Sequence, residues 1–323
     1  MKLDARASIR PTSTCAGRKW RDIFYTSRDG LRLYARHYPA PDSPRRPVLC
    51  LPGLTRNARD FHSLAMYLSA AAHATARDVY AIDYRGRGRS AHDPDWRNYS
   101  LQVEVLDVLD FMTLAGLNEA AVIGTSRGGL IAMIMATMRP GSLGAVVLND
   151  IGPVLEREGL ARIVAYVGRV PLPSSWSEAA RLVQDMNRAH FPDVTDEQWL
   201  EIARQWFDDV NGKPAYGYDQ NLGKAINLLN GPVPELWPQF EALSRLPTLA
   251  IRGELSDILT DTTLASMRLR HPRLETLTVH RQGHAPFLSE EQIQAAIAGF
   301  LASADPAAAP CATLPAADGT APR

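Results

Sequence analysis

The sequence is poor in cysteine. Among 323 residues there are three cysteines, Cys15, Cys50 and Cys311. An odd number of cysteines without C-x-x-C spacing excludes a disulfide framework and a zinc site built from cysteine pairs. Cys50 lies in the apolar run 48–51, so we expect it to be a small core residue.

The chain also lacks a charge excess and a long apolar segment. Its 35 basic residues balance 35 acidic ones, which argues against nucleic acid or an anionic membrane as a partner. The longest apolar run, 130–138, is too short to cross a bilayer. No apolar segment follows the charged residues at the N-terminus, so no secretory signal is expected. We therefore predict a cytoplasmic protein that binds neither nucleic acid nor membrane.

The length and composition fit one large core with a second, smaller lobe. Hydrophobic residues make up 46% and charged residues 22%, the balance of an ordinary globular protein. Residues 1–19 are predicted to be a polar arm. Residues 302–323 are rich in Ala and Pro with little to bury, and are predicted to be a disordered tail.

Short apolar or alternating runs between these ends alternate with helical patterns. Strands are predicted over 31–37, 48–51, 78–82, 120–123, 145–148, 248–251 and 274–279. Helices are predicted over 61–71, 101–115 and 129–138. This alternation predicts an α/β fold with a mostly parallel sheet and helices on both faces.

One long segment interrupts the alternation. Residues 153–243 show helical stretches, 177–188 and 196–210, and no strand pattern. A helical excursion between two strands predicts an inserted helical cap, with the core formed by 20–152 and 244–301. Its aromatic side chains either pack a small core of the cap or line an apolar substrate pocket; they are Trp176, Trp199, Trp206, Phe207 and Trp237.

The candidate nucleophile is Ser126, in the pentapeptide Gly124-Thr125-Ser126-Arg127-Gly128. The pentapeptide follows the predicted strand 120–123 and opens a predicted helix. A serine exposed on so tight a turn needs small neighbours, which the two glycines provide, and this is the G-x-S-x-G pattern. The helix N-terminus adds positive potential where an oxyanion would form.

The candidate base is His284, in the loop after the last predicted strand. That loop would return an imidazole to the carboxyl edge of the sheet, where Ser126 is expected. His280 and His284 also have H-x-x-x-H spacing, but no third ligand is near in the sequence, so zinc binding is not expected.

A histidine base needs a carboxylate that fixes its tautomer. We predict Asp257, in the loop after the strand 248–251, which gives the chain order Ser, Asp, His. Two alternatives stay open. Glu254 lies in the same loop, and Asp150 follows the predicted strand 145–148 at what looks like the entry to the cap.

An oxyanion hole needs two backbone N–H donors. The first is predicted to be the amide of Arg127, which follows the nucleophile. The second is predicted to be the amide of Leu54, in the loop after strand 48–51, where Gly53 permits close backbone approach.

With these motifs, residues 29–301 resemble the α/β-hydrolase fold family. The run 83–90, Asp-Tyr-Arg-Gly-Arg-Gly-Arg-Ser, is similar to the D-x-R-G-x-G-x-S turn of that family. The resemblance implies an eight-stranded sheet, a cap over the site and no cofactor. Pro52-Gly53 stands where many relatives have His-Gly, a change that keeps the backbone donor. Ala91 replaces the third glycine of a dinucleotide-binding fingerprint, which excludes that motif.

The resemblance implies hydrolysis of carboxylic esters through an acyl-enzyme, with a small ester carrying an apolar acyl group as substrate. A serine nucleophile disfavours haloalkane dehalogenases and epoxide hydrolases, which use aspartate there. The loop after Gly53 lacks the extra glycines typical of carbon–carbon bond hydrolases. That activity, a lactonase of the same fold and a non-catalytic ligand receptor remain alternatives.

Overall fold

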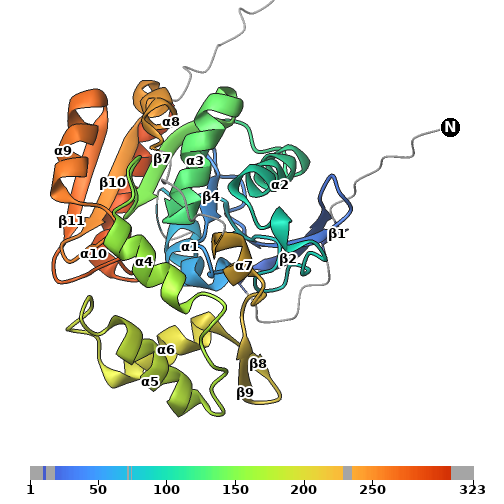
Figure 1. The fold of residues 1–323 in the computed structure, drawn as a ribbon. Helices are drawn as coiled ribbons and strands as arrows, with labels where there is room; N and C mark the ends of the chain where they lie inside the picture. The colour runs from blue at the N-terminus through green and yellow to red at the C-terminus, as the bar shows by residue number, and fades with distance from the viewer. Residues whose placement is uncertain (1–9, 12–18, 71–72, 74, 228–234, 307–323) are drawn as a thin grey trace, which may run out of the picture.

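A central β-sheet organises the molecule. The computed structural model describes residues 10–11, 19–70, 73, 75–227 and 235–306. The strands of the sheet are β1 (Arg10–Pro11), β2 (Arg21–Thr26), β3 (Arg32–Tyr38), β4 (Val48–Leu51), β5 (Val79–Asp83), β6 (Ala120–Thr125), β7 (Leu143–Asn149), β10 (Thr248–Gly253) and β11 (Leu274–Val279). Among the described residues they lie in the order β1-β2-β3-β5-β4-β6-β7-β10-β11 (Figure 1).

The sheet is mostly parallel. Every pairing from β5 across to β11 is parallel, whereas the pairs β1–β2, β2–β3 and β3–β5 are antiparallel. The predicted α/β fold class is confirmed. All seven strands predicted from the sequence are present. The structure adds β2, where Ile23 and Tyr25 alternate as buried residues, and the two-residue β1.

Helices cover both faces of the sheet, as predicted (Figure 1). They are α1 (His62–Ser69), α2 (Leu101–Leu114), α3 (Arg127–Met138), α9 (Asp261–Arg270) and α10 (Glu291–Ala304). Alternate residues of one strand face the two layers: Leu49 and Leu51 pack with α2 and α3, while Val48 and Cys50 pack with α1 and α10. This period of two explains why the strand reads as a continuous apolar run, since both its faces are buried.

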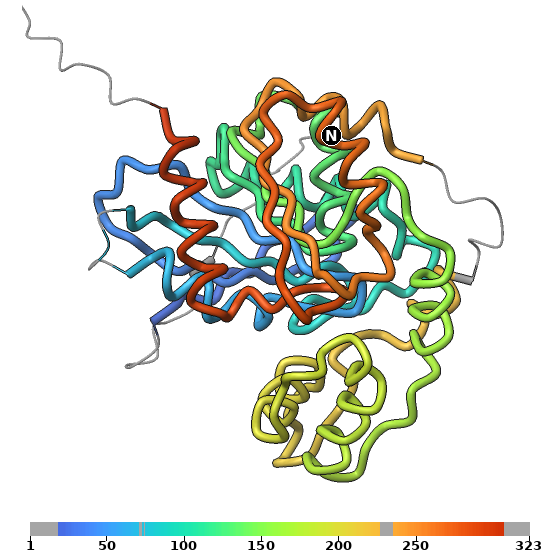
Figure 2. Tube along the Cα trace, turned by 90° about the vertical axis from the view of Figure 1, so that its left-hand side faces the viewer, coloured from blue at the N-terminus to red at the C-terminus, as the bar shows by residue number. Residues whose placement is uncertain are grey.

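The insertion after β7 contains α4 (Arg157–Tyr166), α5 (Trp176–Asn187), α6 (Asp196–Trp206), β8 (Phe207–Val210), β9 (Lys213–Tyr216), α7 (Leu222–Asn227) and α8 (Trp237–Glu241). Of these, α5, α6, β8 and β9 form a lobe below the sheet (Figures 1 and 2). Short 3-10 helices elsewhere are η1 (Ala58–Phe61), η2 (Trp96–Asn98), η3 (Pro140–Ser142) and η4 (Ala242–Arg245). We call residues 174–217 the cap lobe. It has its own apolar core, which includes Val183, Trp199 and Phe207.

The prediction that the insertion is free of strands is wrong. β8 and β9 pair antiparallel around Asn211 and Gly212, both of which have positive φ. An Asn-Gly pair in the left-handed region is the preferred two-residue hairpin turn. The predicted helix 196–210 therefore ends at Trp206, four residues early.

The predicted domain boundaries also shift. Phe240 of α8 and Ile163 of α4 pack into the main core, so only part of the insertion stands apart as the cap lobe. α10 continues to Ala304, past the predicted start of the tail, and Asp305 accepts hydrogen bonds from the buried Arg77. The rest of the predicted tail, 307–323, and most of the predicted arm lie outside the described residues. Among the described helices, none has the length and apolarity needed to cross a membrane.

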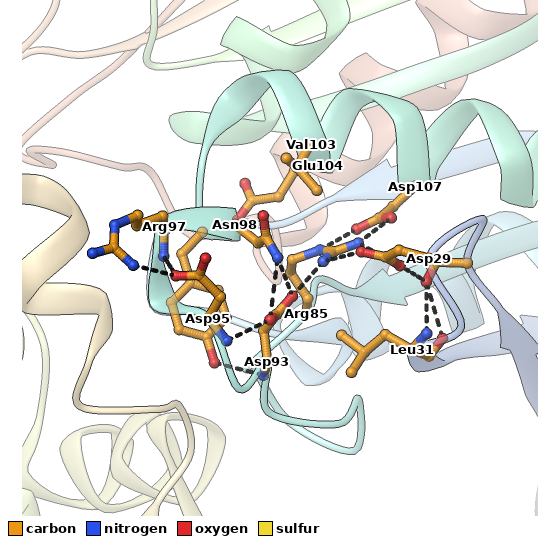
Figure 3. Close-up of polar contacts among 12 residues, drawn as sticks. Asp29, Leu31, Arg85, Asp93, Asp95, Arg97, Asn98, Val103, Glu104 and Asp107 are labelled. Atoms are coloured by element: carbon orange, nitrogen blue, oxygen red, sulfur yellow. Dashed lines mark hydrogen bonds and ion pairs between the residues drawn. The ribbon is translucent and has the colours of Figure 1, made fainter.

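A buried arginine connects two loops and helix α2 beside the sheet. The Arg85 side chain is fully buried and hydrogen-bonds to Asp29, Asp93 and Asp107 (Figure 3). Asp107 lies on α2, Asp29 between β2 and β3, and Asp93 after β5. Burial raises the pKa of Asp107 to about 6, against the hydrogen bond from Arg85 that lowers it. The cluster is therefore a buried charge network that needs its central cation.

We predict that Arg85→Gln strongly destabilises the fold. Loss of one partner of a buried ion pair typically costs about 3–5 kcal/mol, because the remaining charges stay buried without compensation. Urea unfolding followed by circular dichroism measures the change. The matched control is Arg28→Gln, since Arg28 makes a similar bond to Asp110 at an exposed position and should change the unfolding free energy little. Equal effects of both variants would contradict the prediction.

Candidate active site

Ser126 stands on a strained turn between β6 and α3. Its backbone has φ 51° and ψ −114°, a conformation that non-glycine residues rarely adopt. A Cβ at Gly124 would come within 2.5 Å of the Gly128 backbone, and one at Gly128 within 2.1 Å of the Leu51 carbonyl oxygen. Larger residues at these two positions would push the turn apart. The strain thus presents the Ser126 hydroxyl at the carboxyl edge of the sheet.

The loop between β11 and α10 carries His284 to this hydroxyl. His284 Nε2 lies 2.8 Å from Ser126 Oγ. The structure therefore brings together the two residues that the sequence proposed as nucleophile and base, although they are far apart in the chain.

The carboxylate at the other ring nitrogen belongs to Asp150. His284 Nδ1 lies 2.8 Å from Asp150 Oδ2. Asp150 is fully buried, and it also accepts hydrogen bonds from the Gly253 amide at 2.7 Å and the Ser256 hydroxyl at 2.6 Å. An ionised carboxylate only accepts hydrogen bonds, so Nδ1 carries the proton and Nε2 is left free to accept one from Ser126.

The prediction that Asp257 orients His284 is wrong. Asp257 instead accepts two hydrogen bonds from Arg162 on α4, at 2.6 and 2.9 Å. The cause is the course of the loop after β10: it turns at Gly253 so that the Ser256 hydroxyl, not the next residue, reaches Asp150. Burial acts to raise the pKa of Asp257, but the hydrogen bond and charge of Arg162, together with nearby histidines, lower the pKa overall.

The other alternative, Glu254, also lies away from the imidazole of His284. Its carboxylate accepts the Arg281 amide and pairs with His280 on the surface. His280 therefore pairs with the carboxylate of Glu254 outside the candidate active site. In the part of the chain that the structure describes, no cluster of three or more His, Cys, Asp or Glu side chains could hold a metal ion.

The backbone amides of Leu54 and Arg127 flank the nucleophile. Arg127 is the first residue of α3, so its N–H has no carbonyl partner one turn earlier in the helix. Gly53 brings the second loop close: a Cβ there would lie 3.9 Å from the Ser126 Cβ. Both residues predicted as oxyanion donors therefore belong to backbone segments next to Ser126.

A buried carboxylate, Glu104 on α2, connects these two segments. It hydrogen-bonds to the Arg127 side chain and, at 2.7 Å, to Arg87. Arg87 in turn donates to the Leu54 carbonyl oxygen at 2.9 Å. Burial acts to raise the pKa of Glu104, but the charges of Arg127 and Arg87 hold it below its ordinary value. Sequence analysis missed this network, since nothing in the local pattern marks Glu104 as different from a surface helix residue.

A cavity opens between Ser126 and the insertion. The volume of this cavity is about 150 Å³. Its walls include apolar side chains from α4, the α5–α6 connection, α6 and the His284 loop, namely Ile163, Phe191, Trp199, Ile202, Trp206, Phe287 and Leu288. Of the aromatic residues of the insertion, Trp199 belongs to the cap core and lines this cavity, Phe207 belongs to the cap core and lines a smaller second pocket, and Trp237 packs on Phe240 of α8.

The chain belongs to the alpha/beta hydrolase family, whose model matches residues 48–296. It is 30% identical over 274 residues to the 3-hydroxybutyrate-oligomer hydrolase of Cupriavidus necator, covering 82% of this chain and 91% of that protein. It is 26% identical to the sn-1-specific diacylglycerol lipase ABHD11 of Mus musculus, covering 81% and 82% of the two chains.

A solved alpha/beta hydrolase from Novosphingobium aromaticivorans shares 39% identity with this chain. The two superimpose with a TM-score of 0.81, over 88% of this chain and 98% of that one. The alpha/beta hydrolase fold, expected from the sequence motifs, is therefore established by family, relatives and structure together.

We predict that the imidazole proton of His284 reports the Asp150 contact in solution. A proton held between Nδ1 and a buried carboxylate gives a strongly downfield proton resonance. In Asp150→Asn this resonance should shift upfield or disappear, and in Asp257→Asn it should remain. Proton NMR of the three proteins checks this. Retention in the Asp150 variant and loss in the Asp257 variant would contradict the geometry.

Proposed function

We propose that this protein is a serine hydrolase that cleaves carboxylic esters, with Ser126 as nucleophile, His284 as base and Asp150 as the acid. The observation that carries the proposal is the continuous hydrogen-bond chain from Ser126 Oγ through the two nitrogens of His284 to Asp150. A serine hydroxyl is a weak nucleophile unless a base with the correct tautomer accepts its proton.

In the proposed mechanism Ser126 Oγ attacks the ester carbonyl carbon while His284 Nε2 takes the hydroxyl proton. The carbonyl oxygen becomes an oxyanion that the amides of Leu54 and Arg127 stabilise. When the C–O bond breaks, His284 returns the proton to the departing alkoxide, and an alcohol leaves. Water, deprotonated by His284, then attacks the acyl-enzyme, which releases the acid and restores Ser126. Asp150 stabilises the imidazolium of His284 during both acylation and deacylation.

The relatives support an ester as the substrate. The Cupriavidus necator protein is named for oligomers of 3-hydroxybutyrate, which are linear esters of a hydroxy acid, and the Mus musculus protein for diacylglycerol. The apolar cavity wall, with Ile163 and Trp199, suits an aliphatic chain beside the reacting carbonyl. We propose small aliphatic esters, oligomers of short hydroxy acids included, as the substrate class.

We predict that Ser126→Ala abolishes ester hydrolysis and reaction with a fluorophosphonate probe. Loss of the nucleophile of such a triad lowers turnover on the order of a million-fold in a well-studied example. Hydrolysis of 4-nitrophenyl butanoate and gel fluorescence of the labelled protein measure the two effects, and circular dichroism checks the fold. Labelling of the variant at the wild-type level would show that another residue is the nucleophile.

A second prediction separates the two candidate acids. Asp150→Asn should reduce turnover by about ten-thousand-fold, the cost of the wrong imidazole tautomer in the serine proteases. Asp257→Asn keeps the His284 contact and should cost far less, with its main effect on the pairing with Arg162. Measurement of kcat for both variants on one ester decides between them. A larger loss in the Asp257 variant would move the acid back to the loop after β10.

A further inference from the structure

Two arginines that the proposed mechanism does not use line the cavity beside Ser126. Arg56 Nε and Nη2 bond the two oxygens of Asp60 at 2.7 and 2.6 Å. Arg162 bonds Asp257 through the same two nitrogens. In both pairs the carboxylate occupies one edge of the planar guanidinium and leaves Nη1 outside the pair. Each arginine is therefore held rigidly with part of its donor set uncommitted.

The uncommitted nitrogen of Arg56 is the unusual one. Arg56 Nη1 is buried, yet it has no hydrogen-bond partner among the described residues. Buried donors are nearly always satisfied, because an unpaired one loses its hydration without compensation. Burial also lowers the pKa of Arg56 below its ordinary value, although the charge of Asp60 acts to raise it. A buried guanidinium whose Nη1 is bonded to none of the described residues can donate to an acceptor group on a bound substrate.

Neighbouring contacts place the aliphatic part of the Arg56 side chain near the nucleophile. A Cβ at Gly53 would lie 3.2 Å from Arg56 Cγ and 3.9 Å from Ser126 Cβ, so the two side chains flank one glycine. The guanidinium stacks on Trp206, with Cζ 4.4 Å from the ring centroid. Tyr166, one helical turn after Arg162, also lines the cavity, and the charges of Arg162 and Arg56 both oppose the burial that raises its pKa. Both arginines thus act on the same wall.

A carboxylate is the ligand that this wall fits best. Its two oxygens accept hydrogen bonds from guanidinium N–H groups in one plane, and charge-assisted bonds of this kind are strongest where water is excluded. Asp60, the acidic side chain among the cavity-lining residues, has both oxygens bonded to Arg56, so it does not compete for the free edge. The apolar side chains that line the same cavity would contact the aliphatic part of the substrate.

We propose that Arg56 and Arg162 form a subsite for a carboxylate on the substrate, so that the protein prefers esters that also carry a free acid. This inference rests on the proposed function and names its substrate class: half-esters of dicarboxylic acids, or hydroxy acid esters with a free carboxyl end. The anion anchors one end of the substrate, while the ester carbonyl lies at Ser126.

The test compares esters that differ only in a carboxylate. Ethyl hydrogen adipate is paired with ethyl hexanoate, and 4-(butanoyloxy)butanoate with butyl butanoate, so each anion replaces a terminal methyl group on the acyl or the alcohol side. Acid release at constant pH gives kcat/KM. The wild-type protein should favour the anion in at least one pair. Arg56→Gln should lower that anion-to-neutral ratio by about tenfold or more, the size of a lost charge-assisted hydrogen bond.

Two further variants sharpen the comparison. Arg56→Gln combined with Asp60→Asn removes the ion pair without leaving a bare carboxylate, and the ratio should fall here too. If it falls only in the single variant, repulsion by Asp60 is the cause and the subsite is refuted. Arg157→Gln, at an exposed position on α4, is the control for Arg162→Gln and should leave the ratio unchanged. Arg162→Gln carries the same test if Arg56→Gln does not fold.

Binding without turnover separates this inference from the proposed function. Calorimetry of Ser126→Ala with ethyl hydrogen adipate should show binding that Arg56→Gln weakens, with ethyl hexanoate as the neutral reference. If neither ester is hydrolysed, the proposed function fails and calorimetry alone decides the subsite. If neutral esters are hydrolysed and the wild-type protein shows no preference for the anion in either pair, the proposed function stands and the subsite is overturned.

Discussion

The geometry around Ser126 depends on one buried carboxylate, Glu104. Its two oxygens hold the Arg127 and Arg87 side chains, and Arg87 holds the Leu54 carbonyl. The backbone segments that carry the two candidate oxyanion donors come from different strands and have no covalent reason to keep their spacing. Besides the pairing of β4 with β6, the fully buried Glu104 and Arg87 and the partly buried Arg127 hold that spacing, because moving either segment would separate charges in a medium of low dielectric. The ion pairs of Glu104 therefore support the strained turn at Ser126.

The sequence predicted the fold well because the strands are buried on both faces. Continuous apolar runs such as 48–51 and 120–123 favour a strand that is buried on both faces. The turn at Ser126 is also decided locally, because contacts below 3 Å require glycine at fixed positions on either side of the serine. The β8–β9 hairpin was missed because Phe207-Asp208-Asp209-Val210 continues the helical spacing of α6, although Asn211-Gly212 is a turn signal. Local patterns thus predict what local sterics decide.

The acid could not be chosen by such patterns. β7 and β10 are adjacent and parallel, so the residues that follow them reach the same edge of the sheet. Asp150 and Asp257 therefore meet the same sequence criterion. The choice depends on three contacts far apart in the chain: the Gly253 amide and Ser256 hydroxyl bind Asp150, and Arg162 binds Asp257. Only the three-dimensional course of the loop and of α4 supplies them.

The position of Asp257, away from His284, affects the charged groups around the cavity. Because Asp150, and not Asp257, lies at His284 Nδ1, Asp257 is free to hold Arg162, which anchors the first helix of the insertion to the loop after β10. Arg59, in the segment after β4, makes a second such ion pair with Asp208 of the cap lobe, whereas the Arg56–Asp60 pair lies within that segment. Charge pairs, rather than apolar contact alone, thus join the insertion to the core around the cavity. A cavity bordered by paired arginines is electrostatically different from a purely apolar one, so we expect it to discriminate between substrates of equal size by their charge.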